Sequence, residues 1–381
     1  MNMTETIFKD RQQNNGEITT LEGKQKTKWT RIFLLCMAAV LGISISVMNY
    51  HYDSLARYPY RDEESRRLIK EYLNDEEIDY IIEYSIAPNM FISFIEAPGF
   101  NIYHAAEYKR LSLVLWQETP AHIVRIVEDT WGKVDSDTLQ TLLSYDNNNY
   151  SCSEFEDWIE NGDSYAPDAR LLINVNGTSA FLTCDLTIGK REAKNLVNIA
   201  AEDATIPVTD SSLQVTAETM QALKDLFAAY EAEVQEQAQA EAQSQTQSQT
   251  TSLEDASSGL EIGAAYISYK EQEERFNNGE SKFKPGQDEH QLGTSVDFEV
   301  DGLSNAMFEK TWQCQWLEDN AWKYGFVETY TAEDEELSGI TAEPYHYRYV
   351  GKDLAEKLHE NGLTLFRYDA NQDIDTISIA R

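Results

Sequence analysis

The chain has 381 residues, which is enough for two or three domains of ordinary size. It carries 66 acidic and 31 basic residues, so its formal charge at neutral pH is −35. This balance argues against nucleic acid, or an anionic lipid surface bound through bulk charge, as a partner. The four cysteines show no C-x-x-C spacing, which argues against a disulfide-rich scaffold and a cysteine-built metal site. The sequence leaves two alternatives: a disulfide between Cys152 and Cys184, or buried cysteines that are free thiols.

An uncharged apolar run at 32–48 follows a polar segment that ends in several lysine and arginine residues. A membrane-spanning helix needs at least about 17 apolar residues, and basic residues remain on the cytoplasmic side. We therefore expect a cytoplasmic tail over residues 1–31 and a transmembrane anchor over residues 32–50, which contacts the lipid bilayer. The chain would be a single-pass protein of the cell membrane with everything after the anchor outside. A cleaved signal peptide is the alternative, but the polar segment is long for one and no A-x-A-like site follows.

Residues 51–165 show helical signals and scattered histidines without a catalytic cluster. Asn74 precedes Glu77 by three residues, as in a capping box, and Thr119-Pro120 supplies a cap and a first helical position. We expect a mostly helical extracytoplasmic region that serves either as a spacer or as a docking module.

Residues 166–381 have a mixed helix and strand pattern. Residues 217–234 have an apolar face at helical spacing and predict an amphipathic helix. A low-complexity Gln/Ala/Ser/Thr stretch follows at 235–252, with nothing to bury. Aromatic residues at helical spacing predict one helix over 303–324, and Asn361-Gly362 is expected to end a helix that begins at residue 352.

Two short runs near the C-terminus carry the residues with the clearest chemistry. The first, DEHQLGTSVDFEV at 288–300, contains His290 and Asp297, and alternates like a strand at its end. The second, EPYHYRYVG at 343–351, contains Glu343 and His346, and Pro344 disfavours a helix there.

Two imidazoles and one carboxylate are a common ligand set for a catalytic zinc ion, which keeps one position open for water. We therefore predict that His290, Asp297 and His346 bind Zn²⁺. Glu343, three residues before His346, is the expected catalytic base for the bound water. The alternative is two ordinary histidines on strands of an acidic domain.

These two runs resemble the VanY-like zinc D-alanyl-D-alanine carboxypeptidases and their motifs S-x-H-x-x-G-x-A-x-D and E-P-W-H. The segment WLEDNAWKYGF at 316–326 and the segment at 349–365 resemble further blocks of the same family. The resemblance spans roughly residues 190–381. It implies an α+β fold, in which a zinc carboxypeptidase-like domain with a small antiparallel sheet and flanking helices occupies residues 166–381. It also implies that residues of about 235–258 form a disordered insertion within that domain, and it leaves open that the preceding helix runs into this insertion.

The resemblance implies one zinc ion and removal of a C-terminal D-alanine from peptidoglycan stem peptides. Gln272 fits the family's carboxylate-binding glutamine, while Asp288 and Tyr345 occupy positions where the family has serine and tryptophan. We expect these three residues to contact the substrate. The chain departs from the pattern at two positions. Ile267 stands where the family has a carboxylate-binding arginine, and Thr329 stands where the family usually has a second arginine.

Three functions remain open at this point. The first is a membrane-anchored carboxypeptidase of D,D or L,D specificity. The second is a catalytically impaired peptidoglycan-binding or sensor protein that keeps the zinc site, as the two departures would allow. The third is a zinc amidase or peptidase with another substrate, as Asp288 would allow.

Overall fold

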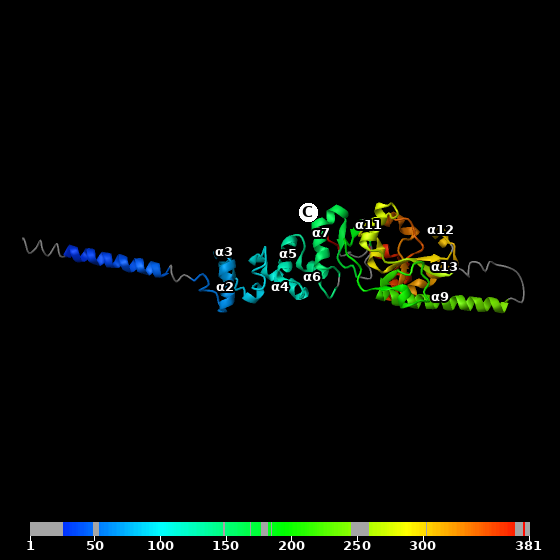
Figure 1. Cartoon of the computed structure of the whole chain (residues 1–381), viewed down its shortest axis with the longest axis horizontal. Helices are drawn as coiled ribbons and strands as arrows, with labels where there is room; N and C mark the ends of the chain where they lie inside the picture. Colours follow the sequence, from blue (N-terminus) through cyan, green and yellow to red (C-terminus); the bar gives the residue numbers. More distant parts are fainter. Residues whose placement is uncertain are drawn as a thin grey trace, which may run out of the picture. The chain divides into compact units, whose positions relative to one another are not determined.

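The computed structural model describes residues 26–48, 53–147, 149–167, 169–176, 182–183, 185–244, 259–301, 303–369 and 376–377. Figure 1 follows the elements along the chain. The chain divides into two compact units, Met1–Glu96 and Ala97–Arg381. Most of the expected cytoplasmic tail, residues 1–25, lies outside the described residues.

The apolar run near the N-terminus lies in a single helix, Lys26–Met48, of 23 residues. At 1.5 Å per residue this helix is about 35 Å long, enough to cross a hydrocarbon layer of about 30 Å. All its side chains are exposed, which excludes a buried core helix. Its length and composition suit either a membrane anchor or a signal sequence.

The first unit also contains a short helical segment with two capped helices, α2 (Glu63–Tyr72) and α3 (Asp75–Glu83), and a 3-10 turn, η1 (Pro88–Met90). The predicted capping box is present: the Asn74 side chain accepts from the backbone N–H of Glu77, whose carboxylate accepts from the N–H of Asn74.

The second unit begins with helices, as expected for this region. They are η2 (Ile102–His104), α4 (Ala105–Val114), α5 (Pro120–Thr130), α6 (Ser136–Leu143) and α7 (Cys152–Tyr165). Thr119 caps α5 through its hydroxyl, as predicted. Cys152 and Cys314 are buried free cysteines, whereas Cys184 lies outside the described residues.

Two small sheets connect these helices to the C-terminal region. One joins β2 (Leu186–Thr187), β1 (Arg170–Leu172) and β9 (Thr376–Ile377), and the other pairs β3 (Leu196–Asn198) with β4 (Gln214–Thr216). The short helix α8 (Ile199–Glu202) follows β3. The Tyr150 hydroxyl donates to the carbonyl of Leu172 at 2.6 Å, and Lys190 pairs with Asp157 at 3.0 Å.

A four-stranded antiparallel sheet forms the centre of the C-terminal region. Its strands lie in the order β5 (Leu260–Ala264), β6 (Ser295–Val300), β8 (His346–Tyr349) and β7 (Phe326–Glu328). The inward residues Val296, Phe298 and Tyr347 are buried, so one face is covered by helices. The predicted α+β fold with a small antiparallel sheet is confirmed.

The long helix α9 (Ala217–Ser244) covers this face, and its Phe227 ring lies 6.2 Å from the ring of Phe298. The predicted helix over 217–234 is therefore present, and it continues to residue 244. Residues 235–244, expected to be disordered, are helical because the alanines and glutamines there favour helix continuation. Residues 245–258 lie outside the described residues.

The single helix predicted over 303–324 is wrong. The chain forms three pieces instead: α12 (Asn305–Phe308), α13 (Trp312–Asn320) and η4 (Ala321–Tyr324). The break occurs because the Thr311 hydroxyl accepts from the backbone N–H of Cys314 at 3.1 Å and starts a new helix. The remaining elements are α11 (Tyr269–Asn277), η3 (Glu289–Leu292), η5 (Ala332–Asp334), α14 (Glu335–Ser338), α15 (Lys352–Asn361) and α16 (Leu365–Asp369).

Candidate metal centre and its pocket

Two of the predicted metal ligands lie on neighbouring strands. Asp297 of β6 and His346 of β8 are register partners in the antiparallel ladder. Residues directly opposite each other in such a pair project to the same face. Asp297 Oδ1 lies 2.8 Å from Nδ1 of His346.

The third predicted ligand, His290, lies on the turn η3. The Asp288 carboxylate accepts from the backbone N–H of His290 at 2.9 Å and so caps this turn. Gly293 ends the turn with φ 73°, a conformation that glycine adopts without penalty. A Cβ atom there would lie 3.0 Å from Leu196 Cδ2, so the Leu196 side chain would have to shift to admit one.

The turn and the two strands bring three donor groups together. His290 Nε2 lies 3.2 Å from Asp297 Oδ1, and the ligand atoms of His290, Asp297 and His346 all lie within 4.8 Å of one another. The two imidazole rings are perpendicular, with centroids 4.9 Å apart. This convergence of two nitrogens and one carboxylate oxygen fits a divalent transition metal.

His346 also contacts a buried ion pair between Glu289 and Arg348. Nε2 of His346 lies 3.3 Å from Oε2 of Glu289, and Oε1 of Glu289 accepts a hydrogen bond from Arg348 at 3.0 Å. The exposed fractions of Glu289 and Arg348 are 0% and 2%. Metal-binding histidines commonly hold their second nitrogen against a carboxylate in this way, which fixes the ring orientation.

The charges of the cluster favour a cation at its centre. Burial alone would lower the pKa of His346, but Asp297 and Glu289 outweigh it and raise the pKa to about 10. Burial would likewise raise the pKa of Asp297, but His290 and His346 hold it well below its usual range. Burial opposes ionisation of Glu289 too, yet Arg348 and His346 lower its pKa to about 2. A metal ion needs neutral imidazoles and would displace the protons that these carboxylates now favour; the two nitrogens and one carboxylate oxygen are a donor set that fits such an ion.

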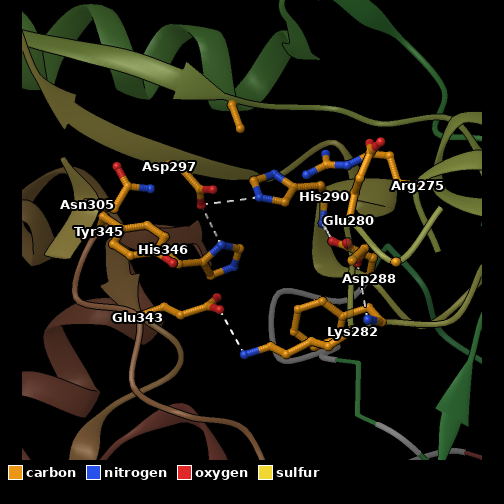
Figure 2. Close-up of a pocket in the computed structure, with 14 residues that line it drawn as sticks. Arg275, Glu280, Lys282, Asp288, His290, Asp297, Asn305, Glu343, Tyr345 and His346 are labelled. Atoms are coloured by element: carbon orange, nitrogen blue, oxygen red, sulfur yellow. Dashed lines mark hydrogen bonds and ion pairs between the residues drawn. The ribbon is translucent and has the colours of Figure 1, made fainter.

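The ligands line one side of a cavity of about 520 Å³. Figure 2 shows Glu343 below His346, with Lys282 pointing toward it from the opposite wall. Lys282 Nζ lies 2.9 Å from Oε1 of Glu343. Tyr345 and Asp288 also line the cavity, so the structure brings six of the seven predicted site residues to one place.

Gln272 is the predicted site residue that does not line this cavity. It is fully buried, and its side-chain amide donates to the hydroxyl of Ser281 and the carbonyl of Phe283 at 2.8 and 2.7 Å. Gln272 therefore supports the segment that carries Lys282. Its contact with substrate stays a prediction.

The two departures from the family pattern lie in the protein interior. The exposed fractions of Ile267 and Thr329 are 5% and 0%, and neither residue lines the cavity. Arg275 and Lys282 do line it, so cations are present in the pocket despite the isoleucine.

Several residues of the site escaped the sequence reasoning. Tyr330 is buried and stacks on His346 with ring centroids 4.8 Å apart, and its carbonyl accepts from the backbone N–H of Glu343. Arg348 follows His346 by two residues, so strand alternation could have placed it on the same face. Lys282 lies in a loop, where no local pattern identifies a pocket residue.

A second group with metal-ligand chemistry lies in the helical region, where none was expected. Glu118, His122 and Cys152 have ligand atoms within 4.8 Å of one another. Both nitrogens of His122 contact carboxylates, with Glu118 at 2.6 Å and Glu156 at 2.8 Å. The histidine thus bridges two helices as a paired side chain.

Comparison with known proteins finds similarity in the C-terminal region. The family model VanY, described as D-alanyl-D-alanine carboxypeptidase, matches residues 212–352, which include the metal cluster and Glu343. The predicted family resemblance is therefore confirmed over these residues.

Curated relatives match shorter parts. A D-alanyl-D-alanine carboxypeptidase of Enterococcus faecalis is 40% identical over 84 residues, which cover 22% of this chain and 30% of that protein. The putative carboxypeptidase YodJ of Bacillus subtilis is 38% identical over 125 residues, or 29% of this chain and 46% of that protein. The chain thus spans less than half the length of either relative. A solved structure of the LdcB LD-carboxypeptidase aligns with a TM-score of 0.43 and 26% identity, over 53% of this chain and 90% of that one.

Proposed function

We propose that this chain, whose residues 212–352 match the VanY family model, is a zinc-dependent carboxypeptidase that removes a C-terminal D-alanine from peptidoglycan stem peptides. The observation that carries the proposal is the convergence of two imidazoles and a carboxylate beside Glu343 in one cavity. The relatives named D-alanyl-D-alanine carboxypeptidase support the substrate class.

In this proposal His290, Asp297 and His346 hold the zinc ion. A bound zinc ion would act as a Lewis acid that polarises the scissile carbonyl and acidifies a water molecule. Glu343 takes the proton of the attacking water on a carboxylate oxygen and delivers it to the nitrogen of the leaving D-alanine. Its side chain is 18% exposed toward the cavity and can therefore meet both partners.

The neighbouring residues orient the reacting groups. Glu289 holds Nε2 of His346, which directs Nδ1 toward Asp297. Tyr345 lines the cavity and packs edge-on against Phe308, so it limits the space for the leaving residue. Asp288 uses one oxygen to cap the turn of His290 and can accept a substrate N–H with the other.

We also propose that helix Lys26–Met48 anchors the protein in the cell membrane, with the N-terminus in the cytoplasm and the catalytic domain outside. The basic residues at its N-terminal end support this orientation. Membrane fractions washed with alkaline carbonate would retain an anchored chain of full length. Release of a shortened soluble chain would instead indicate a cleaved signal sequence.

The activity is tested with the full-length chain in mild detergent, loaded with zinc. The substrates are a stem pentapeptide that ends in D-Ala-D-Ala and the corresponding tetrapeptide, and mass spectrometry follows the loss of one alanine. We expect loss from one of the two, which also decides between D,D and L,D specificity. A chelator should abolish the loss, and Glu343→Gln should reduce kcat by about 10²–10⁴-fold.

Glu356→Gln is the matched control, because it makes the same change on the exposed face of α15, outside the cavity. It should leave the rate unchanged. Zinc-loaded protein that leaves both peptides intact would refute the proposed activity. A Glu343→Gln variant as active as the control would refute the assignment of the base.

A further inference from the structure

Among the described side chains that line the cavity, carboxylates outnumber the groups with a fixed positive charge, and the proposed substrate adds a further carboxylate. Four carboxylates line it: Glu280, Asp288, Asp297 and Glu343. A peptide with a free C-terminus needs a cationic partner in such a place, because an unpaired carboxylate loses its hydration without compensation. Among the described lining residues, Arg275 and Lys282 carry a fixed positive charge.

Lys282 is the better placed of the two. In a carboxypeptidase the leaving amine nitrogen and the terminal carboxylate are attached to the same Cα, so the nitrogen and the carboxylate carbon are only about 2.5 Å apart. Glu343 must reach that nitrogen to protonate it. Lys282 Nζ, 2.9 Å from Oε1 of Glu343, is therefore within reach of the terminal carboxylate. In Figure 2 Arg275 lies well apart from the pair formed by Lys282 and Glu343.

Breaking the ion pair between Lys282 and Glu343 costs little free energy. The Lys282 side chain is 48% exposed, and an ion pair this open to water contributes at most about 1 kcal/mol. Its ammonium group also lies 5.2 Å from the centre of the Phe283 ring, so its position is restrained from a second side. While the pair is intact, Lys282 occupies Oε1, one of the two carboxylate oxygens of Glu343 that can act as the base.

We propose that Lys282 selects substrates with a free C-terminal carboxylate by exchanging its ion pair with Glu343 for one with that carboxylate. The exchange frees Glu343 only when a suitable peptide is bound. Lys282 thus takes over the recognition that Ile267 cannot provide, and links recognition of the chain end to the availability of the base. This inference rests on the proposed carboxypeptidase function.

The test compares the preferred stem peptide with the same peptide bearing a C-terminal carboxamide. Full-length, zinc-loaded protein is used, and kcat/KM is measured for both substrates. We expect wild type to favour the free acid. Lys282→Met should lower kcat/KM for the acid by about 10–100-fold. It should raise kcat/KM for the amide, because Oε1 of Glu343 is then free without an exchange, so that the preference collapses. Lys282→Arg should restore part of it.

Lys284→Met is the matched control, since Lys284 is exposed on the same loop but does not line the cavity. It should keep the wild-type preference. A Lys282→Met variant that keeps the preference would overturn the inference and leave the proposed function standing, and so would loss of the preference in Arg275→Met alone. Wild-type protein that cleaves neither peptide overturns the proposed function and this inference with it. Zinc content and circular dichroism establish that each variant is folded.

Discussion

Replacing Arg348 by methionine should destabilise the protein strongly, because it leaves the Glu289 carboxylate buried without its cation. Glu289 and Arg348 are 3.0 Å apart, and at most 2% of either residue is exposed. Removing one partner of such a buried pair lowers the free energy of unfolding by about 3–5 kcal/mol. His346 remains as a second partner of Glu289 at 3.3 Å, so we expect the lower end, about 3 kcal/mol. That is a large share of the total stability of an ordinary domain.

The assay is urea denaturation followed by circular dichroism, with three variants beside wild type. Arg170→Met is the control, since it breaks a pair of similar length, 3.2 Å, whose side chains are 44% and 61% exposed. It should cost less than about 1 kcal/mol. Combining Arg348→Met with Glu289→Gln removes both charges and should recover part of the loss. A loss for Arg348→Met no larger than that for Arg170→Met would refute the reasoning.

Three further predictions concern the metal, a buried carboxyl group and a glycine. Zinc at 100 times its Kd should stabilise the fold by about 2.7 kcal/mol, so a chelator should lower the Tm of wild type but not of His346→Ala; equal shifts would contradict the ligand assignment. Burial, with Glu318 and Glu309, raises the pKa of Glu328 from 4.5 to about 7. The folded state therefore keeps this proton when the unfolded state has lost it, and the free energy of unfolding should fall as pH rises from 4.5 to 7. Glu328→Gln should flatten this slope in denaturant titrations, and an unchanged slope would exclude Glu328 as its source. Gly293→Ala should cost about 1–2 kcal/mol for its backbone alone and more for its clash with Leu196. Gly339→Ala, at φ 70° with open space around it, measures the backbone part, so equal losses in urea would contradict the packing argument.

The sequence predicted the parts of the fold that local patterns determine. Apolar spacing identified helix α9, alternation identified strand β6, and Asn74 with Glu77 identified a helix start. The helix expected over 303–324 failed for a reason of the same local kind. Thr311 can continue a helix or cap a new one, and the aromatic spacing on both sides hid that choice.

In the candidate site, too, local sequence patterns predicted some features and could not predict others. The sequence predicted His290, Asp297 and His346 as metal ligands because their residue types and spacing suit that chemistry. Their register across β6 and β8, and the burial of Glu289 behind them, follow from strand pairing that no local pattern specifies. The position of Lys282 opposite Glu343 joins residues 61 apart in sequence, so only the tertiary structure could provide it.

The pairing of Asp297 with His346 also makes the candidate metal centre dependent on correct folding. Successive residues of a strand face opposite sides, so a slip of one residue between β6 and β8 would turn one ligand away from the other two. An unfolded or misregistered chain therefore has no complete site, and metal affinity arises together with the native sheet. Under the topology proposed above, the ion would be captured only after the sheet has closed outside the membrane.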